Sequence, residues 1–314
     1  MENLIYSLNA TIPVFIVIVV GYFLKRIGWI QEEFIKGANK INFRLTLPAL
    51  LIQDLMNTDF QQEFDLKFVF YCAGVTCISF FSCWFFAKFF VRKEVVGEFV
   101  QASFRSSAAV LGAAFVVNIY GNTGMVPLMI IGAVPLYNIF SVIVLTVECP
   151  EENAIQQKTM KTTLKGIATN PIIIGIIIGV GLSMLKVDFP KVIDNTLGNF
   201  ARISTPLALL AIGGAFEFGK AMKELRPAVL ATFLKLIGFA AIFLPVAIQL
   251  GFRDEKLMAI IIMLCSPTTP SCFIMAKSMK SEGTLTSSVV VLATLCSAFT
   301  LTAVIFIVKT LGYL

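Results

Sequence analysis

Long apolar segments occupy most of this 314-residue chain, and they restrict its fold more than any other feature. Ten of them lie approximately at residues 7–24, 38–58, 66–90, 99–119, 125–147, 168–185, 195–216, 226–250, 256–278 and 285–309. A helix that crosses a bilayer needs about 20 mostly apolar residues. Inside the bilayer the backbone polar groups must be paired within the protein, and continuous apolar runs favour helices over the alternating pattern of a barrel. The sequence therefore predicts an all-α integral membrane protein with ten transmembrane helices.

Composition excludes several classes of protein. Apolar residues make up 57% of the chain and charged residues only 14%, against about 45–50% and about 25% in soluble domains. Ten spans leave no room for a separate soluble domain, so we expect the lipid bilayer, and not a nucleic acid, as the partner. The chain has no histidine, the commonest general base and metal ligand, and its seven cysteines form no CxxC pair. We therefore predict no enzymatic activity, no metal site and no cofactor.

The distribution of basic residues predicts the orientation. Of the 25 Lys and Arg residues, fifteen fall in the predicted loops or adjoining span ends on one side of the membrane, six in those on the other side and four further inside the spans. Cytoplasmic loops of membrane proteins carry the excess of basic residues. We therefore expect a multi-pass protein of the plasma (inner) membrane whose more basic side is cytoplasmic and whose two termini both lie outside.

An internal repeat relates the two halves of the chain. ATIPVFIVIVVG, residues 10–21, matches ATNPIIIGIIIG, residues 168–179, at six of twelve positions, with a shift of 158 residues. The same shift pairs Arg44 with Arg202 and Pro48 with Pro206 in the second span of each half. Shared apolar composition does not explain why one shift aligns Pro, Gly and Arg across two spans, so the pattern indicates a duplicated unit.

Each half holds five predicted spans. We assign residues 1–148 to a first five-helix repeat, residues 149–167 to a cytoplasmic linker and residues 168–314 to a second five-helix repeat. Because five is odd, the second copy enters the membrane from the opposite side, which gives a 5+5 inverted repeat. Many secondary transporters have this architecture, with the substrate site near the midplane between interrupted helices.

Two prolines predict where a helix breaks. Pro267 and Pro270 lie in the middle of the ninth span, where each removes a backbone donor and clashes with a preceding carbonyl. Subtracting 158 from 270 gives 112, and Gly112 lies in the fourth span. We therefore expect crossed, broken helices in spans four and nine. A merely kinked helix, whose serines bond to their own preceding turn, is the simpler alternative.

Charges inside the spans suggest the ligand. Arg105 lies beside the serines of the fourth span, and Lys235 lies about ten residues into the eighth, near its middle. Acidic residues such as Asp54 and Glu217 lie nearer the predicted helix ends, so an anion is the natural ligand. Lys235 can either contact that anion or pair with carbonyls that the break leaves free, and the sequence does not decide between these roles. The predicted substrate-binding residues are Arg105, Ser106, Ser107, Gly112, Lys235, Pro267, Thr268, Thr269, Pro270 and Ser271.

Six short motifs follow one another along nearly the whole chain: LPALL (47–51), FRSSAAVLG (104–112), NPIIIGIIIG (170–179), PLALLAIGG (206–214), LKLI (234–237) and SPTTPSCFIMA (266–276). In this order they resemble the auxin efflux carrier family, which includes plant PIN proteins and bacterial malonate and malate permeases. The resemblance implies crossed helices four and nine, a scaffold of helices 1, 2, 6 and 7, and a moving domain of helices 3–5 and 8–10. It also implies an organic-anion substrate and an elevator-like movement. The short loop between the fifth and sixth spans favours a prokaryotic member.

The sequence thus predicts a secondary transporter of small organic anions, carboxylates such as malate or malonate, that works by elevator-like alternating access. Two alternatives remain open. One is a sodium-coupled symporter of the bile-acid type, and the other is a membrane sensor that binds the anion without moving it. The sequence also leaves a homodimer open.

Overall fold

The computed structural model describes residues 2–56, 65–108, 116, 124–148, 168–185 and 189–314, and the regular structure of these residues is entirely helical. The first half contains α1 (Glu2–Arg26), α2 (Glu32–Ile41), η1 (Asn42–Thr46), α3 (Leu47–Met56), α4 (Leu66–Phe90), η2 (Lys93–Val95), α5 (Val96–Phe104) and α7 (Val126–Val147). The second half contains α9 (Pro171–Leu185), α10 (Lys191–Ala215), α11 (Phe218–Lys223), α12 (Leu225–Phe233), η5 (Leu234–Gly238), α13 (Phe239–Gln249), α14 (Asp254–Cys265), α15 (Ser271–Ser278) and α16 (Thr284–Thr310). The predicted helical class is confirmed.

Among the described residues, four helices have the length and composition to cross a membrane. They are α4, α7, the continuous helix Leu225–Gln249 formed by α12, η5 and α13, and α16. α9 is apolar but shorter, with 15 residues. The predicted count of ten spans is therefore not confirmed. The ninth predicted span is interrupted between α14 and α15, whereas the second is covered by the consecutive helices α2, η1 and α3.

Glycines allow close packing between the two halves. A Cβ atom added to Gly21 on α1 would lie 2.5 Å from the backbone oxygen of Leu210 on α10. A Cβ atom added to Gly179 on α9 would lie 3.0 Å from the Cβ atom of Leu55 on α3. Gly21 and Gly179 are the residues that the 158-residue shift pairs. Each therefore packs its own helix against the second predicted span of the opposite half.

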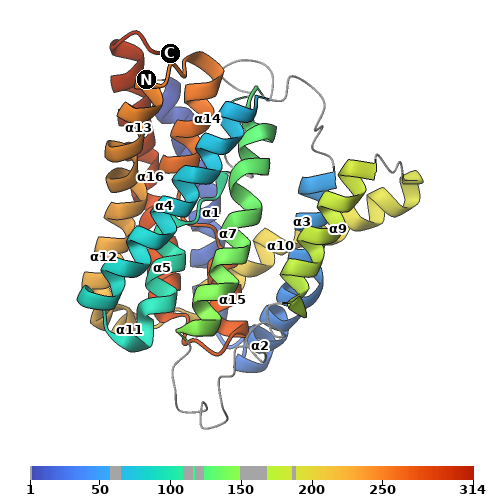
Figure 1. Ribbon diagram of the computed structural model, residues 1–314. Coiled ribbons are helices and arrows are strands. Elements are labelled where there is room, and N and C mark those ends of the chain that lie inside the picture. The colour runs from blue at the N-terminus through green and yellow to red at the C-terminus, as the bar shows by residue number, and fades with distance from the viewer. Residues whose placement is uncertain (1, 57–64, 109–115, 117–123, 149–167, 186–188) are drawn as a thin grey trace.

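Contacts between helices divide them into two groups, and Figure 1 shows α3 and α9 of the first group set apart from α4, α5 and α12 of the second. The first group comprises α1, α2, η1, α3, α9 and α10, in which α1 packs on α10 and α3 packs on both α9 and α10. The second group comprises α4, α5, α7 and α11 to α16, in which α4 packs on α5 and α7, and α16 packs on α12 and α14. Contacts of α1 with α16 and of α10 with α15 join the groups.

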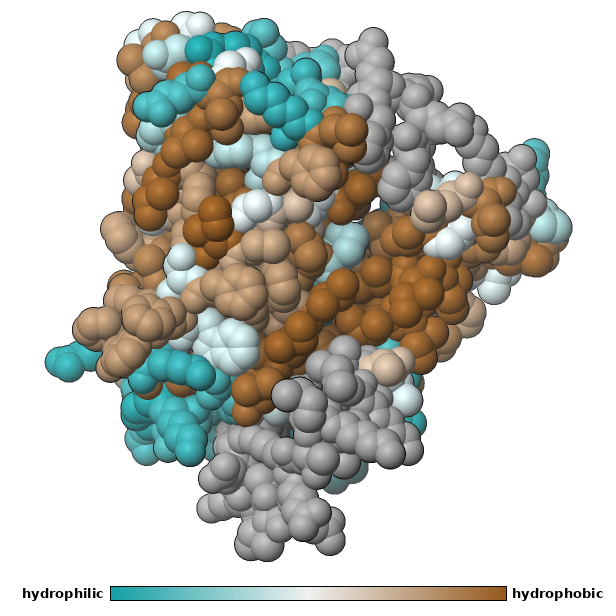
Figure 2. Space-filling view, viewed as in Figure 1, coloured by the Kyte–Doolittle hydropathy of each residue, from teal (hydrophilic) through white to brown (hydrophobic). Residues whose placement is uncertain are grey.

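The outer surface matches an apolar environment. Large side chains such as Phe70 and Phe85 on α4 and Ile177 on α9 are about two-thirds exposed, at 70%, 69% and 65%. Figure 2 shows hydrophobic side chains over the middle of the molecule and hydrophilic ones gathered toward its ends. A broad exposed apolar surface of this kind is what lipid covers in a membrane protein. The two chain termini lie at the same end of the molecule (Figure 1), which agrees with the prediction that they share one side.

Candidate functional site where two interrupted helices meet

The ninth predicted span is broken, as its two prolines predict. α14 ends at Cys265, and Ser266 is extended with φ −67° and ψ 149°. The chain resumes a helix only at Ser271, after Pro270. Because proline lacks the backbone donor that a helix needs, Pro267 and Pro270 prevent α14 from continuing into α15. The interruption that the sequence predicts in this span is therefore present in the structure.

The fourth predicted span leaves the α-helix at Arg105. α5 ends at Phe104, and Arg105 is extended with φ −75° and ψ 145°, close to the angles of Ser266. Gly112, the residue expected to set this break, lies outside the described residues. The end of α5 precedes it, and a tertiary contact accounts for that end, because the backbone N–H of Ser107 donates to the carbonyl of Pro267 at 2.9 Å. A helix can end without a local breaker when another segment takes up its backbone groups.

Three hydrogen bonds hold the two interrupted segments together. Besides the Ser107 bond, the Thr268 hydroxyl donates to the carbonyl of Ala102 at 2.7 Å, and the Gln101 amide donates to the carbonyl of Cys272 at 3.0 Å. The first two of these bonds pair backbone groups at the interruptions, those of Ser107, Pro267 and Ala102, and the third ties α5 to the first turn of α15. Unpaired groups cost several kcal/mol each in lipid, so the bonds explain how two breaks persist side by side.

Lys235 pairs with the end of α14. Its ammonium donates to the carbonyls of Leu264 at 2.7 Å and Met263 at 3.2 Å, and the residue is only 1% exposed. The π-helical turn η5 carries Lys235 in the middle of the eighth predicted span. A cation at a helix C-terminus also interacts favourably with the helix dipole. The geometry therefore supports the carbonyl-pairing role for Lys235.

Arg105 is buried among neutral acceptors. It is 3% exposed, and its Nη2 donates to Asn138 Oδ1 and to Ser271 Oγ, each at 2.9 Å. Its Nη1 lies 2.6 Å from Met275 Sδ, and its Nε finds no acceptor among the described residues. No carboxylate of the described residues forms an ion pair with it. Within the part of the chain that the structure describes, this guanidinium therefore has neutral partners only, in a setting where a charge is expensive to bury.

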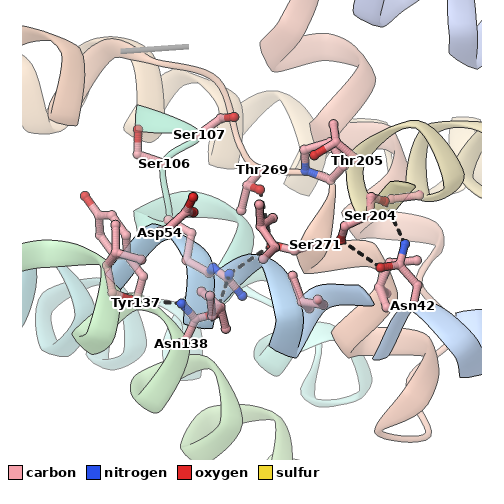
Figure 3. Close-up of a pocket in the computed structure, with 18 residues that line it drawn as sticks. Asn42, Asp54, Ser106, Ser107, Tyr137, Asn138, Ser204, Thr205, Thr269 and Ser271 are labelled. Carbon is pink, nitrogen blue, oxygen red and sulfur yellow. Dashed lines mark hydrogen bonds between the residues drawn. The ribbon is translucent and has the colours of Figure 1, made fainter. Parts of the chain in front are cut away.

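Arg105 lines a cavity, and Figure 3 labels most of the polar residues around it, among them Asn138 and Ser271. About 60 Å³ of it is open to the centres of water molecules, and one water needs about 10–15 Å³ on this measure. The cavity therefore has room for a few waters or a small anion. Its polar lining residues are Asn42, Asp54, Arg105, Ser106, Ser107, Tyr137, Asn138, Ser204, Thr205, Thr269 and Ser271. They come from η1, α3 and α10 of the first helix group and from α7 and the two interrupted segments of the second, so the cavity lies between the groups.

A family profile described as membrane transport protein matches residues 6–305. The chain belongs to the membrane transport protein family. Three curated relatives, each named an uncharacterized transporter YfdV, come from Escherichia coli K12, Escherichia coli O157:H7 and Shigella flexneri. Each is 24% identical over 283 residues, which covers 87% of this chain and 88% of the relative. The match confirms the resemblance to auxin efflux carriers and establishes a multi-pass membrane transporter with bacterial relatives.

The cavity of this membrane transport protein contains most of the predicted site residues. Arg105, Ser106, Ser107, Thr269, Pro270 and Ser271 all line it. Pro267, Thr268 and Lys235 instead hold the interrupted segments in place behind it, through the bonds described above. Gly112 lies outside the described residues. The predicted set thus combines residues that can meet a ligand with residues that support them.

Sequence reasoning missed the contribution of the first helix group to the site. Asn42 Oδ1 accepts from Thr46 Oγ1 at 2.7 Å and from Ser204 Oγ at 2.9 Å, and Asn42 Nδ2 donates to the carbonyl of Ser204 at 2.8 Å. The 158-residue shift pairs Thr46 with Ser204. A signal was therefore present, because equivalent hydroxyl residues in two repeated spans are expected to meet near the axis between the halves.

Two acidic residues lie inside the molecule, Asp54 in the cavity lining and Glu98 in the packed interior. Asp54, on α3, lines the cavity (Figure 3), although its place near a predicted helix end made it look peripheral. Glu98 is 2% exposed and accepts from the backbone N–H groups of Gly283 and Thr286 at the start of α16. Glu98 therefore caps a helix, as a carboxylate at an N-terminus commonly does, whereas Asp54 adds a negative group to the site.

Proposed function

We propose that this membrane transport protein is a secondary transporter of small organic anions, carboxylates such as malate or malonate. The observation that carries the proposal is Arg105, a buried guanidinium that lines a cavity and has only neutral partners among the described residues. Planar guanidinium groups match carboxylates well, because they offer parallel N–H donors in a fixed arrangement. A carboxylate substrate supplies the missing countercharge.

Groups beside Arg105 offer hydrogen-bond donors for the second carboxylate of such a substrate. The Ser106 hydroxyl is buried and finds no partner among the described residues, although it lines the same cavity. Ser271 begins α15, so the N-terminal end of that helix lies at the cavity, where its dipole favours an anion. Arg105, Ser106 and the start of α15 therefore offer donors on more than one side of a small dicarboxylate.

We propose a 5+5 inverted repeat of ten spans, with residues 1–148 and 168–314 as the two copies and residues 149–167 as a cytoplasmic linker. The paired glycines Gly21 and Gly179 support it, because each packs on the second predicted span of the opposite half. So do the matching ends of α5 at Phe104 and α14 at Cys265, each followed by an extended residue. An inverted repeat lets one site face either side of the membrane.

The position of the cavity supports an elevator-like movement. Its walls come from both helix groups, so sliding the second group against the first carries Arg105 and the interrupted segments past α3 and α10. In this proposal the first group is the scaffold and the second group moves. A site at the interface between two groups is the arrangement that alternating access needs.

Flux through purified protein in liposomes tests the function. We expect accumulation of labelled malate or malonate well above that in protein-free liposomes, and no comparable uptake of a neutral analogue such as malonamide. Thermal stabilisation by the same anions, measured in detergent, reports binding separately from transport. Binding without flux in either direction would identify the sensor alternative and overturn the transport proposal.

One observation favours coupling to a cation, as in a sodium symporter. Asp54 places a carboxylate in the same cavity as Arg105. Carboxylate oxygens suit both Na⁺ and a transferable proton. Replacing external sodium with choline, and separately collapsing the pH gradient, distinguishes sodium coupling, proton coupling and uncoupled transport in the same liposomes.

Labelling of introduced cysteines tests the proposed topology. In a cysteine-free background, we expect cysteines placed in the 27–31 and 279–283 loops to react only from the cytoplasm of intact cells, and cysteines at both termini only from outside. The reason is that the 27–31 and 279–283 loops lie on the predicted side with the excess of basic residues, which is the cytoplasmic side in membrane proteins. Labelling of the two termini from opposite sides contradicts the ten-span proposal.

A further inference from the structure

We infer that a second cavity, at the basic end of the molecule, binds a polyvalent anion that bears phosphate groups and that this anion holds the two helix groups together. The basic cavity, as we name it, lies between α2, η1, the end of α10 and the end of α15, and about 720 Å³ of it is open to the centres of water molecules. It is far larger than the cavity beside Arg105, so it suits a larger ligand than a small dicarboxylate. The effect on transport rests on the proposed function, whereas the binding does not.

The lining of the basic cavity carries an excess of positive charge. It contains five basic residues and two acidic ones. Both acidic residues are already paired, Glu32 with Lys25 at 2.6 Å and Glu217 with Lys220 at 3.0 Å. The other four cations in the lining form no ion pair with any described residue: Lys36, Lys40, Arg44 and Lys277.

These cations surround one space. Lys36, Lys40 and Arg44 follow one another at intervals of four along α2 and η1, so they share a helix face. Lys277 faces them from the last turn of α15. The pKa of Glu32 is lowered, chiefly by the hydrogen bond from Lys25, and the charges of Lys36 and Lys277 also contribute. Cations of both helix groups therefore contribute positive potential to the basic cavity, at Glu32.

A buried polar group gives a second sign of a ligand. Asn39 lines the basic cavity and is only 6% exposed, yet its Oδ1 finds no donor among the described residues. A buried amide without a partner costs about 1–3 kcal/mol. A surface of solvated lysines has no need of a buried amide. A ligand that carries a hydroxyl group or a bound water can donate the hydrogen bond that Asn39 Oδ1 lacks.

Phosphate is the chemistry that fits four cations. A phosphate monoester carries about two negative charges at neutral pH, and lysine and arginine are its usual protein partners. Two sources offer it at a membrane surface, a soluble polyphosphate and an anionic lipid headgroup. Because α2 and η1 belong to the first helix group and α15 to the second, a bound phosphate compound bridges both. It therefore stabilises the present arrangement and slows any movement of one group against the other.

Binding of pyrophosphate to purified protein in neutral-lipid nanodiscs tests the site. We expect pyrophosphate to raise the melting temperature, and we expect Lys36→Gln/Lys40→Gln to weaken its binding at least about tenfold, since each tenfold is about 1.4 kcal/mol. The matched control is Lys223→Gln/Arg226→Gln, which removes two exposed cations outside the cavity lining and is expected to bind like the wild type. If pyrophosphate binding weakens equally in both double variants, it depends on general surface charge, and the proposal is overturned.

The same variants identify the source of the phosphate. If phosphatidylglycerol nanodiscs, and not pyrophosphate, stabilise the wild type but not Lys36→Gln/Lys40→Gln, the ligand is a lipid headgroup. If neither stabilises the wild type, no phosphate site exists. Retained stabilisation of the double variant by malate shows that the basic cavity is separate from the cavity at Arg105 and that the variant is folded.

Flux measurements test the bridge. Pyrophosphate on the basic side is expected to slow malate flux in the wild type, and Lys277→Gln is expected to remove this inhibition while basal flux persists. Undiminished inhibition in Lys277→Gln overturns the bridging role. Absence of malate flux in every protein, together with pyrophosphate binding that depends on Lys36 and Lys40, refutes the proposed transport function and leaves the binding site standing.

Discussion

Replacing Arg105 with Gln is expected to lower malate or malonate flux by about 30-fold or more. Removing one partner of a buried charged contact costs about 2–5 kcal/mol, and each 1.4 kcal/mol is a factor of ten. The partners of Arg105, Asn138 and Ser271, are neutral. Removing the positive charge therefore leaves no carboxylate of these partners unpaired. The loss is therefore expected in substrate binding. Malate-dependent thermal stabilisation and flux in liposomes both measure it.

Arg202→Gln is the matched control for Arg105. Arg202 also lies within a predicted span, but it is exposed on α10 and does not line the cavity. We expect its substitution to leave flux nearly unchanged. Arg105→Lys keeps the charge but loses the planar arrangement of donors, so we expect it to retain only part of the affinity. Wild-type malate affinity in Arg105→Gln would falsify the assignment of the anion to this cavity.

Replacing Lys235 with Gln is expected to destabilise the protein without changing its affinity for the anion. The ammonium pairs with the carbonyls of Met263 and Leu264, and Lys235 does not line the cavity at Arg105. A buried carbonyl that loses its partner costs about 1–3 kcal/mol. Two such carbonyls at the break of the ninth predicted span therefore make this one of the most damaging single substitutions in the second helix group.

The melting temperature, measured against malate concentration, separates the two roles of Lys235. We expect a lower starting value in Lys235→Gln and a malate-dependent rise of the same size as in the wild type. Lys309→Gln, which removes an exposed lysine from the last turn of α16, is expected to change neither value. A normal starting value with no rise on adding malate contradicts the carbonyl-pairing role and assigns Lys235 to the anion.

Local chemistry in the sequence was sufficient to predict the break in the ninth span. Pro267 and Pro270 lie three positions apart and together remove two backbone donors, whereas the single prolines Pro135 of α7 and Pro206 of α10 lie within continuous helices. The end of α5 is different, because no proline marks it. It depends on Ser107 finding the carbonyl of Pro267, a partner from a distant part of the chain. The sequence pointed instead to Gly112, which lies outside the described residues.

The 158-residue shift pairs residues of the two halves, but it does not show where each side chain points. Gly21 and Gly179, which the shift pairs, both make close contacts with the second predicted span of the opposite half. Asp54 has no such marker. Its position relative to α7 and the interrupted segments depends on how the first helix group packs on the second, so only the structure placed it in the cavity.

The sequence by itself determined the class of this protein, because apolar runs, proline positions and the repeat act through the local backbone and the solvent, whatever the final packing. It sufficed for a helical membrane transporter and for the break after Cys265, and it singled out Arg105, which lines the cavity of the proposed site. Only the tertiary structure decided that Lys235 pairs with carbonyls, that Asp54 and Asn42 share the cavity, and that four cations meet between α2 and α15. These outcomes depend on distances of a few ångströms between residues far apart in the chain, and hydropathy and spacing carry no information about such distances.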